Sequence, residues 1–243
     1  MASKFKHGWF LPNEDEYFEF VLDQYPADND GKRVYQHDHQ VRCLNFLNPS
    51  KVRTAIDIGG HIGFWSYYLA KFFKQVHTFE PIISHIECFK KNVLATNVKL
   101  HVIGLSNREA KVNFITSHKN SGMSSVDPKS DGINGKINLT SLDSYHFNDV
   151  DFIKIDVEGA EYKVIEGAAQ FLQSNSPKIA MEYVAPHRGN KEHTKAHHSL
   201  LEMGYTAYLI DKDGYLQSIA NINAYLEDEH LESDNIVYSK SLK

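Results

Sequence analysis

The sequence has few cysteines and no long apolar run. A membrane-spanning helix needs about 20 consecutive apolar residues, and no stretch of this chain provides them. The first residues also lack the apolar segment of a secretion signal. Cys43 and Cys88 are the only cysteines, and two cysteines do not make a disulfide framework. We therefore expect no membrane span and a reducing, cytoplasmic location.

Long basic runs, internal repeats and low-complexity segments are absent as well. The net charge is −5, so a nucleic-acid backbone is a poor partner for this chain. The hydrophobic content of 42% and the charged content of 23% are ordinary for a globular domain. The 243 residues suffice for one α/β domain with a large core. The composition leaves the oligomeric state open.

The segment Ala55–Ser66 is the most informative part of the chain. An apolar strand ends in Asp57, turns on Gly59, Gly60 and Gly63, and becomes a helix. Such a turn leaves backbone N–H groups at the helix start for an anionic group, and glycine permits close backbone approach. The segment predicts a cradle for a nucleotide-like cofactor.

Dinucleotide binding is the first alternative. Its fingerprint is G-x-G-x-x-G with a pyrophosphate on the helix N-terminus, whereas this chain has G-G-x-x-G. The carboxylate of Asp57 would repel a pyrophosphate, but it suits the amino group of S-adenosylmethionine. The turn therefore favours S-adenosylmethionine over a nicotinamide dinucleotide.

A second strand ends in Glu80, followed by Pro81. This acid lies about 20 residues beyond the glycines, the spacing of a ribose-binding carboxylate. A carboxylate accepts two hydroxyl hydrogen bonds at once, which suits a vicinal diol. A surface glutamate before a proline turn is the alternative. With the glycine turn upstream, we favour ribose binding.

Strand and helix patterns alternate from about residue 52 onward. Strands are predicted at 53–58, 75–80, 98–104, 111–116, 150–155, 178–184, 205–211 and 235–239, and helices at 62–73, 84–95, 160–173 and 194–203. This alternation predicts an α/β fold with a mainly parallel sheet covered on both faces. The strands at 205–211 and 235–239 are expected to pair antiparallel at one edge.

Two regions do not follow this alternation. Residues 1–50 are predicted as a mostly helical N-terminal extension, with its last helix ending at Asn48–Pro49, and residues 51–243 as the main domain. The polar segment Ser117–Gly135 is rich in glycine and is expected to be a mobile, lid-like loop.

Acids at strand ends predict the site, because ligands of open α/β sheets bind outside the carboxyl ends of the strands. Asp57 and Glu80 end the first two strands, and Asp156 ends a later one. Glu182 lies in another strand, and the loop that follows adds His187 and Arg188. We expect these side chains at one edge of the sheet.

The segment Asp151–Ala168 combines an apolar strand, an acidic turn and an amphipathic helix. Asp156 at the strand end is our candidate general base, with Glu182 and His187 as helpers. Asp156, Glu158 and Glu182 are alternatively the oxygen ligands of a Mg²⁺-like cation. The sequence does not decide between a general base and a metal site. For Glu158 and Glu161, stabilisation by the helix dipole is the structural alternative.

This second segment resembles a known family. Ile-Asp-Val-Glu-Gly-Ala-Glu followed by Val-Ile-Glu-Gly-Ala is similar to the hallmark of FkbM-type methyltransferases. Ile-Asp-Ile-Gly-Gly-His-Ile-Gly, Phe-Glu-Pro, Asn113-Phe114 and Ser124-Ser125 before Leu139–Asp143 follow in the family's order, so the resemblance covers about residues 52 to 239. It implies a seven-stranded, Rossmann-like fold and methyl transfer from S-adenosylmethionine to oxygen, often a hydroxyl of a sugar or glycan precursor.

Carried over by position, the resemblance places cofactor contacts and acceptor contacts on separate motifs. The acceptor side would be lined by Asp156, Glu158 and Glu161. The predicted cofactor-binding set is Asp57, Gly59, Gly60, His61, Gly63, Glu80, Pro81, Ser106, Ser125 and Asp156. At Gly60-His61 this chain departs from the Ala-Asn that is commoner in the family.

Other activities stay as alternatives. One is a methyltransferase for another small molecule or a nucleic acid, although no Pro-Pro catalytic turn is present. Another is a non-catalytic cofactor-binding module. A transition metal on His193, His197 and His198 is disfavoured, because no partner acid is evident.

Overall fold

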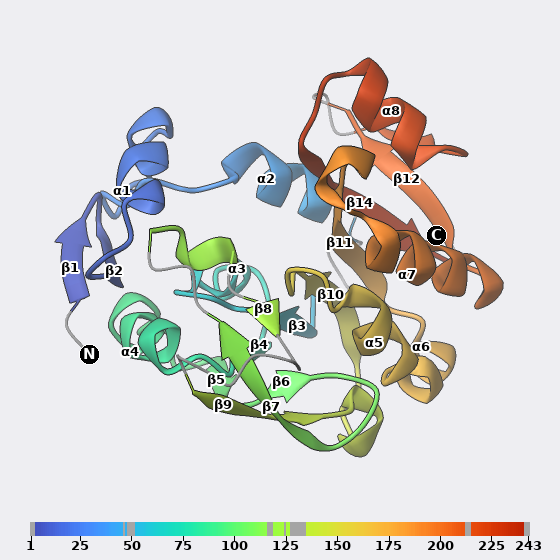
Figure 1. Ribbon diagram of the computed structural model, residues 1–243, viewed down its shortest axis with the longest axis horizontal. Coiled ribbons are helices and arrows are strands. Elements are labelled where there is room, and N and C mark those ends of the chain that lie inside the picture. Colours follow the sequence, from blue (N-terminus) through green and yellow to red (C-terminus); the bar gives the residue numbers. More distant parts are fainter. Residues whose placement is uncertain are drawn as a thin grey trace.

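A twisted sheet of eight strands forms the centre of the molecule (Figure 1). The computed structural model describes residues 3–45, 47, 52–115, 119–123, 125–126, 135–211 and 215–240. The strand order is β13-β12-β14-β11-β10-β3-β4-β5. These strands are β3 (Thr54–Ile58), β4 (Gln75–Phe79), β5 (Val98–His101), β10 (Val150–Ile155), β11 (Lys178–Val184), β12 (Thr206–Ile210), β13 (Leu216–Ser218) and β14 (Ser233–Ser239).

The sheet is parallel on one side and antiparallel on the other. Strands β11, β10, β3, β4 and β5 are mutually parallel. Strand β14 pairs antiparallel with both β11 and β12, and β12 pairs antiparallel with β13. The predicted antiparallel pairing of the last strands is confirmed. The expected count of seven strands is wrong for this sheet, because the short strand β13 adds an eighth at the edge.

Helices cover both faces of the sheet, as the alternation predicts. Ile56 and Ile58 belong to the larger core, which includes residues of α5 (Glu161–Glu166), α6 (Ala169–Asn175), α7 (Lys191–Glu202) and α8 (Ile222–Asp228). Ala55 belongs to a second core with residues of α2 (His37–Asn45) and α3 (Phe64–Leu69). Successive strand side chains point to opposite faces, so Asp57 faces α3.

The N-terminal segment differs from the mostly helical prediction. It begins with an antiparallel hairpin of β1 (Ser3–Lys6) and β2 (Trp9–Pro12), and its helices are α1 (Tyr17–Val21), η1 (Leu22–Gln24) and α2. Trp9 and Leu11 are buried while their neighbours are half-buried, which is the two-residue period of a strand. These side chains share a core with Ile62, Phe64 and Cys88. The domain division at residue 50 stays a prediction.

A smaller sheet of four strands lies beside β5 (Figure 1). Its order is β6-β9-β7-β8, with β6 (Gly104–Leu105), β7 (Ala110–Ile115), β8 (Ser125–Val126) and β9 (Lys136–Thr140). The strand predicted at 111–116 is thus β7, outside the main sheet. Of the expected lid-like loop, residues 119–123, 125–126 and 135 are described, including η2 (Ser121–Met123). The rest of that loop and the predicted helix end at Asn48–Pro49 lie outside the described residues.

The helix predicted at 160–173 is divided in two at Gly167. A Cβ atom on Gly167 would lie only 2.0 Å from the carbonyl oxygen of Ser106. The N–H of Asp143 donates to the carbonyl oxygen of Gly167 at 2.9 Å. This close approach ends α5 and starts α6. Helix α4 (Ile83–Asn92) and the short helices η3 (Leu142–Ser144) and η4 (Pro186–Arg188) complete the described helices. None of these helices has the length and apolarity to cross a membrane.

The turn after β3 fits tightly against the end of β10. Gly59 has a φ of +86°, and a Cβ there would lie 1.8 Å from the carbonyl oxygen of Asp156. The N–H of Asp156 donates to the carbonyl oxygen of Ile58 at 3.0 Å. The glycine is therefore required by the packing of the chain against itself.

We expect Gly59→Ala to destabilise the protein by more than about 3 kcal/mol, because the methyl group meets backbone atoms. The matched control is Gly189→Ala, since Gly189 has a φ of +81° with nothing within 4 Å of its Cβ position. The control carries only the left-handed backbone cost of about 1–2 kcal/mol. Urea unfolding measures both. Equal losses would contradict the role of the contact with Asp156.

Candidate functional site

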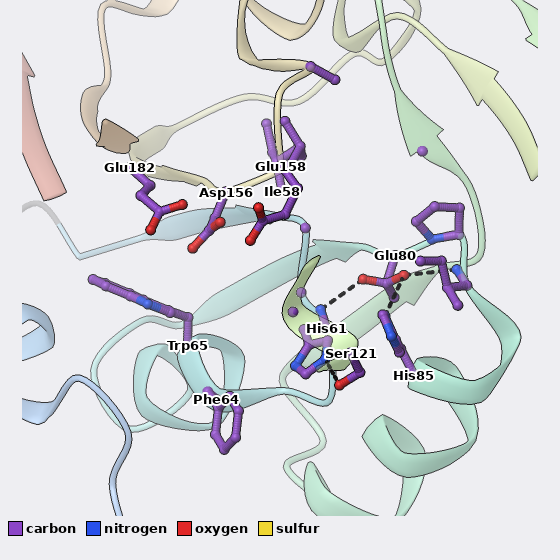
Figure 2. A pocket seen from close by; sticks show the side chains of 18 of the residues that line it. Ile58, His61, Phe64, Trp65, Glu80, His85, Ser121, Asp156, Glu158 and Glu182 are labelled. Atoms are coloured by element: carbon purple, nitrogen blue, oxygen red, sulfur yellow. Dashed lines mark hydrogen bonds and ion pairs between the residues drawn. The ribbon is translucent and has the colours of Figure 1, made fainter. Parts of the chain in front are cut away.

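A cavity of about 300 Å³ opens at the carboxyl ends of β3, β4, β10 and β11. Its lining contains two polar groups, which Figure 2 shows on either side of the turn at Ile58. One group surrounds Glu80, and the other is the acidic group of Asp156, Glu158 and Glu182. Of the predicted site residues, the lining includes Gly59, Gly60, His61, Glu80, Pro81, Asp156, Glu158 and Glu182.

The backbone N–H groups of the glycine turn are largely used by the protein. Those of Gly59 and Gly60 donate to the carbonyl oxygen of Phe79 at 3.0 and 3.2 Å. The N–H of His61 donates to Oε2 of Glu80 at 2.8 Å. The expectation that these N–H groups are free for a ligand's anionic group is therefore wrong for these three residues. They tie the ends of β3 and β4 together instead.

Asp57 and Gly63 lie behind the cavity wall, and neither is among the lining residues. Asp57 is 1% exposed, and its carboxylate accepts a hydrogen bond from the Ser66 hydroxyl at 2.5 Å. Burial raises the pKa of Asp57 to about 6. Gly63 precedes α3 with a φ of +103°, and its Cβ position is 2.4 Å from Cγ2 of Val93. Both residues support the turn from behind.

Glu80 lies in the cavity wall, where its prediction places it, but its carboxylate already has partners in the chain. Oε2 accepts from the N–H of His61, and Oε1 accepts from the N–H of Ile82, each at 2.8 Å. Nδ1 of His85 lies 3.3 Å from Oε1. Each carboxylate oxygen has a second lone pair, so both can accept a further hydroxyl hydrogen bond.

His61 is held in an unusual conformation beside Glu80. Its φ of +48° is in the left-handed region, and its Nε2 lies 2.7 Å from the Ser121 hydroxyl oxygen. The Ser121 hydroxyl also donates to the carboxylate of Asp15. Burial, together with the neighbouring His85, holds the pKa of His61 well below its usual value. The ring is therefore neutral near pH 7.

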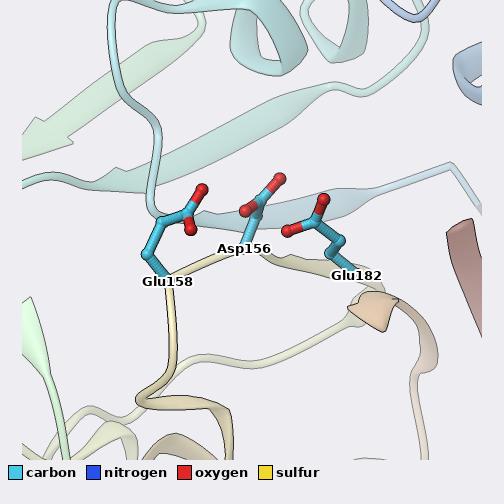
Figure 3. Close-up of side chains that lie close together, drawn as sticks. All are labelled: Asp156, Glu158 and Glu182. Atoms are coloured by element: carbon cyan, nitrogen blue, oxygen red, sulfur yellow. The ribbon is translucent and has the colours of Figure 1, made fainter. Parts of the chain in front are cut away.

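The carboxylates of Asp156, Glu158 and Glu182 form a compact group (Figure 3). One oxygen from each lies within 4.8 Å of the others. Burial and the charge of Asp156 raise the pKa values of Glu158 and Glu182. Part of this group therefore holds protons near pH 7, because adjacent carboxylates disfavour each other's ionisation.

Lys154 brings a positive charge to the acidic group. Its side chain is fully buried, and Nζ lies 3.2 Å from Oδ2 of Asp156. The ammonium also lies 5.2 Å from the centre of the Trp65 ring. The sequence reasoning missed this residue, although a lysine inside the apolar strand Phe152–Ile155 was a usable signal, since buried lysines are rare without a partner.

Three predicted residues have other surroundings. Ser106 is buried outside the lining, and its N–H donates to the carbonyl oxygen of Thr140 at 2.7 Å. His187 is exposed, lies outside the lining, and has Nε2 3.0 Å from Glu232. Ser125 belongs to β8, but its side chain lies outside the described part of the structure.

Glu161 is buried away from the lining, where it orders the acidic turn. Its Oε1 accepts from the N–H of Gly159 at 3.2 Å and of Val157 at 3.4 Å. Its Oε2 lies 3.4 Å from Nε2 of His193. Stabilisation by the helix dipole alone therefore does not account for Glu161. Its hydrogen bonds hold the loop that carries Glu158.

His193 thus lies beside an acid without a hydrogen bond to it, and His197 has Nδ1 3.2 Å from the Tyr238 hydroxyl. Among the described residues, the group of Asp156, Glu158 and Glu182 has the geometry of a metal site, whereas the α7 histidines do not form one. The disfavoured transition-metal site on α7 therefore has no support.

An aromatic wall faces the acidic group, and the sequence reasoning missed it. The wall consists of Tyr17, Phe18, Tyr35, Phe64 and Trp65. The rings of Phe18, Tyr35 and Phe64 are in mutual contact at 5.1–5.2 Å between centres. Burial raises the pKa of Tyr35, and the charges of Asp156 and Glu182 raise it further. Three of its five residues, Tyr17, Phe18 and Tyr35, come from the N-terminal segment, where aromatic residues alone do not reveal a ligand site.

Comparisons with known proteins find similarity to methyltransferases. A family model described as the methyltransferase FkbM domain matches residues 57–207. Among solved structures, the methyltransferase FkbM from Methylobacillus flagellatus aligns with a TM-score of 0.50 and 16% identity, covering 90% of this chain and 57% of that chain. The chain thus spans little more than half of that protein, and at this identity the likeness concerns the fold.

Two further solved structures are similar. A putative methyltransferase from Streptococcus mutans in complex with SAH has a TM-score of 0.47 and 13% identity, with 81% of this chain and 94% of that chain covered. A putative O-methyltransferase from Klebsiella pneumoniae has a TM-score of 0.47 and 14% identity, with 90% and 89% covered. No curated protein sequence matches the chain.

We expect Asp57→Asn to change how stability depends on pH. The pKa of Asp57 in the folded protein, about 6, is raised above its unfolded value. Its contribution to stability is therefore fully present below about pH 4 and is lost as the pH rises through about 6. The variant should gain about 2 kcal/mol over the wild type between about pH 4 and pH 8. Denaturant unfolding at both pH values checks this, with Asp38→Asn at an exposed site of α2 as the control. A constant difference between variant and wild type would contradict the burial of the charge.

Proposed function

The chain belongs to the FkbM methyltransferase domain family, and from this we propose that it is an S-adenosylmethionine-dependent O-methyltransferase. The acceptor that we propose is a hydroxyl group of a sugar or glycan precursor. One observation carries the proposal: a single cavity joins the Glu80 region to the acidic group of Asp156. The first is suited to a nucleoside and the second to a hydroxyl that must lose a proton.

The Glu80 region fits the nucleoside part of S-adenosylmethionine. Glu80 offers two acceptor oxygens at the cavity wall for the ribose diol. Beside it, Pro81 and the buried cluster of Ile82, Phe114 and Ile137 give an apolar wall that suits the flat adenine ring. S-adenosylmethionine, when bound, supplies a methyl group on a positively charged sulfur.

Asp57 takes a different role in this proposal from the one expected from the sequence. Because its carboxylate is buried and bonded to Ser66, we assign it to holding α3 against β3. The carboxylates among the lining residues are Glu80, Glu232 and the acidic group, and the lining also includes Arg188. Negative charge in a low-dielectric wall attracts a cationic ligand.

Asp156 is the proposed general base for the acceptor. A hydroxyl is a weak nucleophile, and a carboxylate that takes its proton makes it stronger. Nζ of Lys154 lies 3.2 Å from Oδ2 of Asp156, so its positive charge attracts that carboxylate and helps to hold it in place. Glu158 and Glu182, whose pKa values are raised, then serve as hydrogen-bond partners of the acceptor. The aromatic wall faces them and provides flat surfaces for an acceptor ring.

A divalent cation held by Asp156, Glu158 and Glu182 is the second candidate for activating the hydroxyl. The three groups offer oxygen ligands alone, which suits Mg²⁺, and they lie within 4.8 Å of one another. The buried Lys154 ammonium already balances part of their charge, so we favour direct base catalysis. His187 points to Glu232 at the surface, and we no longer assign it a helping role.

We expect the protein to bind S-adenosylhomocysteine more tightly than NAD. Glu80→Gln should weaken S-adenosylhomocysteine binding by about 1.5–3 kcal/mol, because charge-assisted hydrogen bonds to the diol are lost. Calorimetry measures both affinities. Glu109→Gln, at an exposed site, is the control. Unchanged affinity in a folded Glu80 variant would remove Glu80 from the ribose site, and tighter binding of NAD would overturn the cofactor assignment.

We expect Asp156→Asn to lower turnover by about 10² or more, the scale of a lost general base, with little change in cofactor affinity. The assay follows labelled methyl transfer to a panel of sugars, with tRNA and DNA as competing acceptors. Asp228→Asn, at an exposed site of α8, is the control.

Chelation separates the two candidate roles of Asp156. Wild-type activity that survives EDTA supports the base, whereas loss on chelation and recovery with Mg²⁺ indicates the cation. Near-normal turnover of Asp156→Asn would exclude both roles. Transfer to tRNA or DNA in place of sugars would overturn the acceptor class, and no transfer at all together with tight cofactor binding would indicate a non-catalytic module.

A further inference from the structure

His85 is a buried side chain in the cavity wall whose hydrogen-bonding capacity is unused by the chain. It lies in the first turn of α4, is 2% exposed and lines the cavity beside Glu80 (Figure 2). Neither Nδ1 nor Nε2 has a hydrogen-bond partner among the described residues. A buried polar group left in this state destabilises the folded protein. An uncompensated cost of this kind at a cavity wall points to a partner from the cavity.

The neighbours of His85 do not supply that partner. Nδ1 lies 3.3 Å from Oε1 of Glu80, close enough for attraction but without hydrogen-bond geometry. The His61 ring stands nearly perpendicular to the His85 ring, with 4.3 Å between their centres. Since His61 already interacts with Ser121 through Nε2, it offers packing to His85 and no hydrogen bond.

The chemistry of His85 matches a hydroxyl group. A neutral imidazole has one donor and one acceptor nitrogen, and a hydroxyl both donates and accepts. Glu80, 3.3 Å away, accepts hydrogen bonds but cannot donate when ionised. An imidazole next to a carboxylate therefore forms a mixed pair, in which each member contacts one of two adjacent hydroxyls.

We propose that His85 is a ligand-contacting residue that binds one hydroxyl of the cofactor's ribose while Glu80 binds the other. This inference rests on the proposed function, because it takes S-adenosylmethionine as the ligand. His85, in the first turn of α4, thus shares the recognition of the ribose with Glu80, which was expected to bind both hydroxyls alone. Pairing with Glu80 for stability only is the competing role.

The test compares ligands that differ in a single hydroxyl. Calorimetry gives the affinities of S-adenosylhomocysteine and of its 2′-deoxy and 3′-deoxy analogues for the wild type, His85→Phe and His85→Gln. His77→Phe is the matched control, because His77 is also buried, lies on β4 and is outside the lining. Thermal unfolding without ligand is measured for all four proteins.

We expect His85→Phe to bind S-adenosylhomocysteine about tenfold or more weakly than the wild type does. For one of the two deoxy analogues, the affinities of the variant and the wild type should agree to within about twofold, because the missing hydroxyl is the one that His85 binds. His85→Gln keeps an amide that can donate and accept, so it should recover part of the affinity. The unfolding temperature of His85→Phe should equal or exceed that of the wild type, since an unpaired buried group is removed.

Other outcomes overturn the inference. If His85→Phe weakens all three ligands equally, or behaves like His77→Phe, His85 does not contact the ribose. A lower unfolding temperature with unchanged affinity would establish the structural role. If the wild type binds none of the three ligands, the proposed function itself fails, and this result is distinct from wild-type binding that His85 does not influence.

Discussion

The backbone contact between the end of β3 and the end of β10 holds the candidate site together. The N–H of Asp156 donates to the carbonyl oxygen of Ile58 at 3.0 Å, and Gly59 leaves room where a Cβ would lie 1.8 Å from the Asp156 carbonyl oxygen. Two motifs about a hundred residues apart thereby meet at one point. The cofactor region and the acidic group are adjacent because the central strands pair in this register. The glycines of the turn thus serve chain packing first and the cavity second.

The cavity concentrates negative charge in a setting where charge is costly. Hydrogen bonds from His61 and Ile82 satisfy Glu80, whereas Asp156 relies on the buried ammonium of Lys154. Glu158 and Glu182 avoid part of the cost through raised pKa values. A cationic ligand would relieve the remaining repulsion. The negative charge of the cavity wall therefore lowers the stability of the protein without ligand and strengthens the binding of a positively charged cofactor.

Much of the sheet and half of the site could be predicted, because strand ends leave clear signals. Strands β3, β4 and β10 are largely buried and have an acid at or directly after their last residues, and parallel strands bring their ends to one edge. Asp57 was predicted to contact the cofactor, but it lies behind the cavity wall. The sequence pattern shows the strand to which a residue belongs but not the face of the sheet on which its side chain lies. The hairpin at residues 3–12 and the aromatic wall escaped prediction, since both depend on contacts with Phe64 and Cys88 far along the chain. Lys154 was not predicted, although a lysine in an apolar strand was a usable signal, and only the structure shows its ammonium beside Asp156.

The N-terminal hairpin has a consequence for the order in which the molecule assembles. The side chain of Asn92 exchanges hydrogen bonds with the backbone of Phe10 at 2.7 and 2.9 Å, and Asp15 accepts from the N–H of Ser121 at 3.1 Å. In a growing chain, β1 and β2 are therefore synthesised before the later residues that the N-terminal segment contacts. Closing such long loops carries an entropic cost, but these contacts reach no farther along the chain than Ser121, ahead of β10, β11 and β14 of the central sheet. During synthesis, the residues of the aromatic wall are therefore present before the acidic group of Asp156, Glu158 and Glu182, which arrives with the later strands of the sheet.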